Sequence, residues 1–317
     1  MFRHYLRQAK SLLLQMFYSG KQFKLLLRMT LEHLDIRLQT LASLTDFFST
    51  VVTPIPITAP FGKSMLVLAP HQDDEVIGCG GTLALQVLNG NAASVVILQD
   101  GADEHDSVSM TREALVELRN QESRDAARMV GIDSPIFLGL RDLRAKADAT
   151  ALALRQIIEE RHVDAIFTPF VLDGHPDHRT CNFILARALS KSNRTLRIFQ
   201  YEVWSHCIPN VVVVIDSVAD KKWKMLACFR FANKALDYAH ATKGLNMFHS
   251  RLLPAGQASY VECFFELPRK EFVELVENLE RAESGDSRRT GPMYHAPMTD
   301  TSSHRRVIPQ AMPLAIP

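Results

Sequence analysis

The stretch MLVLAPHQDDE at residues 65–75 joins an apolar run to a group of ionisable side chains. Its apolar part, residues 65–69, has the length and composition of a buried strand. His71, Asp73 and Asp74 follow at the point where this strand should open into a loop. A buried strand that ends in histidine and aspartate side chains indicates a functional site at the edge of a sheet.

A second stretch of the same kind occurs later in the chain. The apolar run at residues 165–169 leads into Gly-His-Pro-Asp-His at residues 174–178. Pro176 suits the first turn of a helix. His175 and His178 are separated by one helical turn, so both can project toward the same edge. Together, the two motifs supply ligands for a divalent metal and further groups for proton transfer.

Apolar runs predict further strands, and helical periodicity fills the intervals between them. We expect strands at 65–69, 94–98, 135–138, 165–168, 196–201, 211–215 and 259–267, and helices at 76–90, 110–130, 149–161, 178–191, 218–240 and 269–282. Strands that alternate with helices predict a three-layer α/β/α sandwich with a mostly parallel, Rossmann-like sheet. The strand at 211–215 is expected to have antiparallel neighbours. Because ligands bind at the carboxyl ends of parallel strands, both motifs should meet at one edge.

Composition divides the chain into three segments. Residues 1–60 predict a basic amphipathic helical extension and a proline-rich extended linker, since residues 1–28 hold six basic side chains and no acidic one. Residues 61–282 carry the predicted sheet and its helices. Residues 283–317 are rich in serine, proline, arginine and threonine, which predicts a flexible tail.

Two interpretations of the basic segment 1–28 remain open. It can lie in the interface of an anionic membrane, or it can pack its apolar stripe on the main domain or on a second subunit. The chain has no run of about 18 uncharged apolar residues, so we expect no membrane-spanning helix.

Bulk composition limits the partners and the compartment. The five cysteines form no CxxC pair, which indicates reduced thiols and a cytoplasmic protein, at the inner face of the membrane if the basic helix binds lipid. The formal charge of +1 gives no reason to expect a nucleic-acid partner. A homo-oligomer is compatible with the sequence, which does not define the oligomeric state.

The two motifs contain the groups that metal-dependent hydrolysis needs. A catalytic divalent metal has three protein ligands, an open position for water and a nearby carboxylate that is not a ligand. His71, Asp74 and His178 are candidate ligands. Asp73 is then left as a free base and His175 as a second ionisable group. These ligand types suit zinc, but they do not exclude iron, cobalt or another divalent ion.

The glycines after the first motif have a simpler explanation than a nucleotide site. Gly78-Cys79-Gly80-Gly81 does not match the dinucleotide-binding pattern. We therefore expect close packing of a helix on a strand. Cys79 could be a ligand or a nucleophile, but a small packing residue is the favoured interpretation.

The two motifs resemble those of the PIG-L/LmbE-like family of zinc-dependent N-acetylglucosamine deacetylases. In that family the first motif usually reads (Ala/Pro)-His-Pro-Asp-Asp-Glu. Gln72 stands here at the position of the second proline, which is not a ligand. The likeness extends over residues 64–267 and implies an LmbE-like fold.

The resemblance implies a role for each matching side chain. His71, Asp74 and His178 match the zinc ligands of the family. Asp73 matches its general base, and His175 matches the residue that stabilises the oxyanion.

Two further matches concern the substrate. The resemblance implies that Arg119 and Asp142 hold the sugar, a role that suits a guanidinium and a carboxylate. The alternatives are an ion pair of Arg119 with Glu122 or another carboxylate on its helix surface, and a turn role for Asp142.

We therefore predict a zinc-dependent N-deacetylase that converts the acetamide of an N-acetylglucosamine-type sugar to a free amine and acetate. The substrate would be a glycoconjugate or polysaccharide precursor, including a lipid- or nucleotide-linked sugar. Two alternatives remain open: hydrolysis of another amide or an ester at the same metal, and a non-catalytic scaffold in a glycan-assembly complex.

Overall fold

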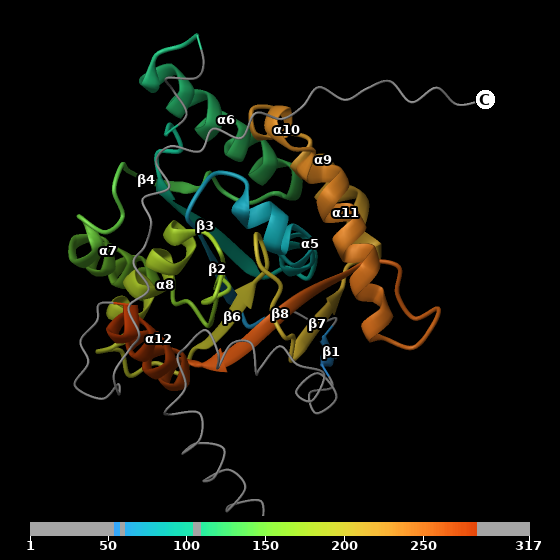
Figure 1. Ribbon diagram of the computed structural model, residues 1–317. Helices are drawn as coiled ribbons and strands as arrows, with labels where there is room; N and C mark the ends of the chain where they lie inside the picture. The colour runs from blue at the N-terminus through green and yellow to red at the C-terminus, as the bar shows by residue number, and fades with distance from the viewer. Residues whose placement is uncertain (1–53, 58–60, 104–108, 284–317) are drawn as a thin grey trace, which may run out of the picture. The chain divides into compact units, whose positions relative to one another are not determined.

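Apolar runs of the chain form a twisted sheet that lies between two layers of helices (Figure 1). The computed structural model describes residues 54–57, 61–103 and 109–283. The strands of the sheet are β1 (Ile55–Ile57), β2 (Ser64–Ala69), β3 (Ala92–Gln99), β4 (Ile136–Leu140), β5 (Ala165–Pro169), β6 (Arg197–Tyr201), β7 (Val211–Val214) and β8 (Val261–Pro268). Their order is β1-β7-β8-β6-β5-β2-β3-β4. Only β8 is antiparallel to its neighbours among these strands, which confirms the predicted mostly parallel sheet.

Helices cover both faces of the sheet, as the α/β/α prediction requires (Figure 1). The helices are α5 (Asp74–Leu88), α6 (Arg112–Val130), α7 (Ala147–Glu160), α8 (Pro176–Leu189), α9 (Ala219–Leu226), α10 (Ala232–Ala235), α11 (Tyr238–His249) and α12 (Arg269–Glu283). One core joins the sheet to α5, α6 and α9, and a second core joins the opposite face to α7, α8 and α12.

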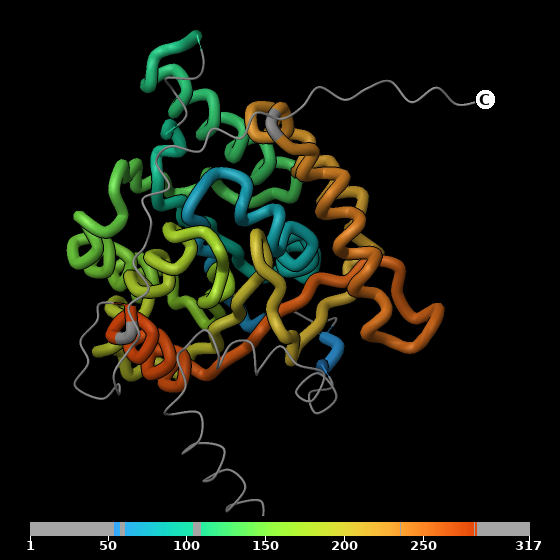
Figure 2. The backbone as a smooth tube through the Cα atoms, viewed as in Figure 1, coloured from blue at the N-terminus to red at the C-terminus, as the bar shows by residue number. Residues whose placement is uncertain are grey.

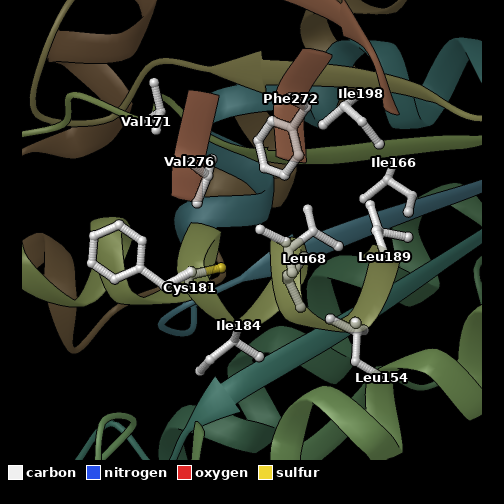
Figure 3. Packing of buried hydrophobic residues seen from close by; sticks show 14 of the residues in the cluster. Leu68, Leu154, Ile166, Val171, Cys181, Ile184, Leu189, Ile198, Phe272 and Val276 are labelled. Carbon is white, nitrogen blue, oxygen red and sulfur yellow. The ribbon is translucent and has the colours of Figure 1, made fainter. Parts of the chain in front are cut away.

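Alternating side chains of each strand divide between these two cores. In β2, Met65 and Val67 belong to the core beneath α5, whereas Leu66 and Leu68 belong to the core beneath α8. Side chains of a strand point alternately to its two faces, so a strand that is covered on both sides reads as a continuous apolar run. Figure 3 shows the second core, where strand residues Leu68, Ile166 and Ile198 lie among Leu154, Ile184, Leu189, Phe272 and Val276 from the helices.

The connections place both sequence motifs at one crevice. β2 lies between β5 and β3, and it is parallel to both. The chain runs from β2 through α5 to β3 on one side, whereas it runs from β5 through α8 to β6 on the other (Figure 2). The strand order therefore reverses between β2 and β5. In open α/β sheets, ligands bind at the carboxyl ends of strands at such a point.

The glycines after the first motif allow α5 to approach its neighbours closely. A Cβ atom on Gly78 would lie 2.1 Å from the ring of Tyr201, and one on Gly81 would lie 2.7 Å from Ile215. Cys79 is buried, and burial raises the pKa of its thiol well above the usual value. The prediction of close helix-to-strand packing is confirmed, and the protonated thiol fits a packing role.

The predicted helix at 218–240 is wrong in its second half. The chain forms the short 3₁₀ turn Asp216–Val218, then α9, a turn and α10, and a separate helix α11. Asp237 precedes α11 and caps it, because its side chain accepts a hydrogen bond from the backbone N–H of His240. Asp237 was the local signal for this helix start.

The ends of the predicted domain differ slightly from the expected boundaries. Residues 55–57, expected in the linker, are extended but join the sheet as edge strand β1, where Ile55 pairs with Val211 of β7. The last helix ends at Glu283. The predicted extension over 1–53 and the tail over 284–317 lie outside the described residues. In the described part of the chain, every helix is too short or too polar to cross a bilayer.

Candidate active site and metal centre

A pocket of about 200 Å³ lies at the carboxyl ends of the central strands. It is lined by His71, Asp73, Asp74, Ile77, Gly101, Asp103, Arg119, His175, Val203, Trp204, Phe231, Ala232 and Tyr238. Residues from both sequence motifs therefore share one pocket with side chains from several later segments.

The three predicted metal ligands converge on one point. His71 lies in the turn after β2, Asp74 is the first residue of α5, and His178 lies in the first turn of α8. Nδ1 of His71 is 3.2 Å, and Nε2 of His178 is 3.3 Å, from the same carboxylate oxygen, Oδ2 of Asp74. One donor atom of each residue lies within 4.8 Å of the others. The structure thus brings these three side chains together from distant parts of the chain.

The donor set fits a divalent cation. His178 is fully buried, and within the described residues neither of its ring nitrogens makes a hydrogen bond of good geometry. A buried polar atom without a well-formed hydrogen bond is costly, and Nδ1 already faces Asp173, so an ion beside Asp74 would satisfy Nε2. Two imidazoles and one carboxylate are a common ligand set for catalytic zinc.

Electrostatics keeps the carboxylate of this centre ionised. Burial acts to raise the pKa of Asp74, but the positive charges of His178 and His71 lower it below its ordinary value. Burial likewise opposes charge on the two imidazoles. Even so, hydrogen bonds to Asp177 and Asp74 raise the pKa of His71 to about 9. The negative charges of Asp74 and Asp173 likewise raise the pKa of His178 to about 10. Asp74 is therefore ionised, and a cation that binds here must displace the protons of the two imidazoles.

Two aspartates support the imidazoles from outside the ligand set. Oδ1 of Asp173 is 3.3 Å from Nδ1 of His178, and Oδ2 of Asp177 is 3.4 Å from Nε2 of His71. A carboxylate behind a metal-binding imidazole orients the ring and raises its basicity. The sequence interpretation assigned neither residue this role. The only signal was their position within and beside the second motif.

Asp73 lies beside the ligands in an unusual backbone conformation. Its φ is 118°, a value that costs about 1–3 kcal/mol for a residue other than glycine. Its backbone N–H donates to Oε2 of Glu75 at 3.0 Å, and its Oδ2 is 3.5 Å from Nη2 of Arg119. Burial raises the pKa of Asp73 to about 7, although the charge of Arg119 opposes the shift. A carboxylate with this pKa can exchange a proton near neutral pH.

His175 is held at the start of α8 with one ring nitrogen facing its own helix. It is the N-cap residue, and its Nδ1 accepts the backbone N–H of Asp177 at 3.2 Å. Its ring centroid lies 4.9 Å from those of both His71 and His178. Burial, together with the charges of these two imidazoles, lowers the pKa of His175. The neutral ring therefore carries its proton on Nε2, which can donate a hydrogen bond in the pocket.

The two predicted sugar-binding residues have different positions. Arg119 lines the pocket, and its guanidinium donates to the backbone oxygens of Gly101 and Gln72 at 2.8 and 3.0 Å. Asp142 lies in an exposed turn after β4 and is not among the lining residues, and its Oδ1 accepts the backbone N–H of Ala145. The structure therefore supports the turn alternative for Asp142, and its contact with sugar stays a prediction.

The alternative for Arg119 is not what the structure shows. Glu122 is buried, and its carboxylate accepts the backbone N–H of Phe231 at 3.1 Å. Arg119 is directed to the first motif instead, where it supports the backbone around Asp73.

An aromatic rim completes the pocket, and the sequence interpretation missed it. Trp204 follows β6, Phe231 lies between α9 and α10, and Tyr238 begins α11. The rings of Trp204 and Tyr238 are 6.2 Å apart, and Trp204 is 54% exposed. Because these residues come from three separate segments, no local pattern links them.

Comparisons with known proteins point to one family. The family model for PIG-L, described as GlcNAc-PI de-N-acetylase, matches residues 66–189. A probable N-acetyl-alpha-D-glucosaminyl L-malate deacetylase 2 from Bacillus subtilis strain 168 is 32% identical over 184 residues, which cover 53% of this chain and 82% of that protein. The protein of the same name from Bacillus cereus is 29% identical over 194 residues, covering 56% of this chain and 88% of its own length.

A solved structure shows the same fold. The N,N'-diacetylchitobiose deacetylase from Pyrococcus horikoshii superposes with a TM-score of 0.57 at 23% sequence identity, covering 66% of this chain and 85% of that chain.

Proposed function

This chain belongs to the PIG-L family of deacetylases, and we propose that it hydrolyses the acetamide of an N-acetylglucosamine-type sugar to a free amine and acetate. The observation that carries the proposal is the convergence of two imidazoles on one carboxylate oxygen. Nδ1 of His71 and Nε2 of His178 both face Oδ2 of Asp74, inside a pocket that also contains Asp73 and His175.

The family and the donor set point to a divalent metal, and we propose zinc. His71, Asp74 and His178 would hold it. When bound there, the ion would lower the pKa of a water molecule and polarise the acetyl carbonyl.

The remaining polar groups would move protons and stabilise charge. Asp73, with a pKa of about 7, would accept a proton from the attacking water. His175 would donate from Nε2 to the oxygen that becomes negative when the carbonyl is attacked. As the amide bond breaks, the proton that Asp73 accepted from water would pass to the nitrogen of the sugar, which leaves as an amine, while the neutral ring of His175 keeps its Nε2 proton.

The pocket walls suit a sugar ring. Trp204, Phe231 and Tyr238 offer aromatic faces, whereas Arg119 and Asp103 offer a cation and an acceptor for hydroxyl groups. The pocket is also open at its aromatic rim, because Trp204 is 54% exposed. A substrate that is larger than one sugar can therefore extend out of the pocket, so a glycoconjugate or polysaccharide precursor is the proposed class.

Mass spectrometry on a substrate panel tests the proposal. Metal-loaded full-length protein is incubated with N-acetylated sugars that are free, nucleotide-linked or lipid-linked, together with acetyl esters and other amides. We expect loss of one acetyl group from an N-acetylated amino sugar and release of acetate. Cleavage of esters alone would contradict the proposed substrate class and would favour an esterase.

The metal proposal is tested separately by elemental analysis. Asp74→Ala should lose the ion of this centre, because the shared carboxylate oxygen is removed. Full retention of metal and activity by Asp74→Ala would contradict the proposed ligand set. A protein that binds no divalent metal, even when zinc is offered, would favour the scaffold alternative.

A further inference from the structure

Three side chains outside the metal centre meet beside the end of β6. Glu202 directly follows this strand, His206 lies in the same loop, and His249 is the last residue of α11. One donor atom of each lies within 4.8 Å of the others. Nε2 of His249 is 2.7 Å from Oε2 of Glu202, and Nδ1 of His206 is 3.7 Å from Oε1 of the same carboxylate.

The carboxylate of Glu202 is held in a state that can bind a cation. Its side chain is buried, and Oε1 accepts the backbone N–H of Cys207 at 2.8 Å, which fixes its orientation. Burial acts to raise the pKa of Glu202, but hydrogen bonds from His206 and His249 lower it to about 2. The group is therefore ionised throughout the neutral range.

The cluster is closed on one side and open on the other. The side chain of His249 is 9% exposed, whereas that of His206 is 72% exposed. An ion would therefore reach the carboxylate past His206 and would keep positions open for water. The competing arrangement is a buried ion pair between Glu202 and His249, in which His206 has no essential part.

We propose that Glu202, His206 and His249 form a second zinc site, separate from the centre at His71. Two imidazoles and one carboxylate are ligands that zinc prefers. Zinc bonds to these ligands are about 2.1 Å long, which places tetrahedral ligand atoms about 3.4 Å apart. The two imidazoles face different oxygens of Glu202, with His249 2.7 Å from Oε2 and His206 3.7 Å from Oε1, so an ion between them would draw the side chains together around one or both of these oxygens.

The second site would join two parts of the pocket rim. Val203 and Trp204 line the pocket, and they lie in the chain between Glu202 and His206. α11 begins with Tyr238, whose ring is 6.2 Å from that of Trp204. An ion held by His249 would therefore connect the loop of Trp204 to the last turn of the helix whose first turn carries Tyr238.

Zinc content distinguishes the site from an ion pair. Full-length protein is stripped with a chelator, dialysed against a small excess of zinc and analysed for zinc per chain. We expect His206→Ala to hold one ion fewer than the wild type, and Asp74→Ala to lose a different one, so that the two losses add in the double variant. His240→Ala, which removes an exposed histidine of α11 outside the cluster, should hold as much as the wild type. Equal zinc content in His206→Ala and wild type would overturn the proposal.

A second measurement needs no variant. The chelator-stripped wild-type protein is treated with diethylpyrocarbonate, with and without zinc, and modified histidines are located by mass spectrometry. We expect zinc to protect His206 while the exposed His240 stays reactive. Modification of His206 to the same extent in both samples would show an ion pair without metal. Because neither residue belongs to the centre at His71, failure of this proposal would leave the proposed deacetylase activity untouched.

Discussion

At the scale of single residues, the chemistry depends on where Asp73 is held. Its positive φ turns the carboxylate of the first motif into the pocket, while the next residue, Asp74, begins α5 and faces the imidazoles. The carbonyl oxygen of Asp73 accepts the N–H groups of Val76 and Ile77, each at 2.9 Å, so the start of the helix stabilises the strained conformation. Adjacent aspartates thereby acquire separate environments and opposite pKa shifts.

Asp73→Asn tests the base directly. Asparagine tolerates a positive φ and has nearly the same volume, but its amide cannot accept a proton from water. We expect activity to fall about 100-fold or more while the metal content stays that of the wild type. Acetate release and elemental analysis of the same sample measure the two quantities. Asp133→Asn, an exposed and remote change of the same kind, should behave as the wild type. Full activity in Asp73→Asn would mean that another group is the base.

At the scale of elements, a break divides α5 into a first part that carries Asp74 of the site and a second part that contacts the sheet. Its helix is interrupted at Cys79, where φ is −144° and ψ is 26°. After the break, the backbone N–H groups of Gly81 and Thr82 donate to the carboxylate of Glu262 on β8, each at 2.8 Å. A carboxylate from another element thus caps the second part of the helix.

Gly78→Ala tests the close packing of α5. The added Cβ would lie 2.1 Å from the ring of Tyr201, a fully buried side chain, so the helix must shift. We expect the free energy of unfolding to fall by about 1–3 kcal/mol or more. Gly244→Ala on α11 is the matched control, because its Cβ would meet nothing within 4 Å. It should raise the free energy of unfolding by about 0.5–1 kcal/mol, since alanine loses less backbone entropy in a helix. Equal effects of the two changes in chemical denaturation would contradict the packing argument.

At the scale of the whole molecule, one buried lysine connects elements that are distant in the chain. Lys222 of α9 is fully buried, and its Nζ donates to the backbone oxygen of Ile77 at 2.9 Å, to Oδ1 of Asn246 at 2.9 Å and to Oε1 of Glu262 at 2.6 Å. All three N–H groups are therefore used, and α5, α9, α11 and β8 share one polar junction. This junction lies on the face of the sheet that also carries the aromatic rim.

Lys222→Met tests the junction. Methionine is also unbranched and is one atom shorter, but it leaves Glu262 buried without its cation, so we expect a loss of about 3–5 kcal/mol in the free energy of unfolding. Lys222→Met combined with Glu262→Gln should recover part of this loss, because no unpaired charge remains. Arg197→Met, which breaks an exposed pair with Glu266, should cost about 1 kcal/mol or less. A small effect of Lys222→Met in chemical denaturation would show that the junction is not required.

The basic segment 1–28 leads to a second prediction at this scale. Six basic residues without an acidic one should attract an anionic lipid surface, and we propose a cytoplasmic protein that contacts the inner face of the membrane. We expect wild-type protein to sediment with anionic vesicles, less so at high salt, and deletion of residues 1–50 to abolish sedimentation. Unchanged sedimentation of the deletion variant would remove the support for membrane contact and favour packing on protein.

The sequence by itself determined the order of strands and helices over most of the domain and identified the candidate metal-binding side chains. Continuous apolar runs identify strands that are covered on both faces, and the two motifs follow two such runs. These are local patterns, so they can be read from the chain. The prediction of one continuous helix at 218–240 was wrong, because distant groups such as Glu122 stabilise a turn between α9 and α10.

Only the tertiary structure decided how these parts meet. The pair of Asp177 with His71, the aromatic rim and the cluster at Glu202 each join segments that are far apart in the chain. Their assembly depends on strand order, on the break in α5 and on the start of α11, and long-range packing controls all three. A sequence pattern records which groups are available, whereas the distances between them follow from the burial of the two cores on either side of the sheet.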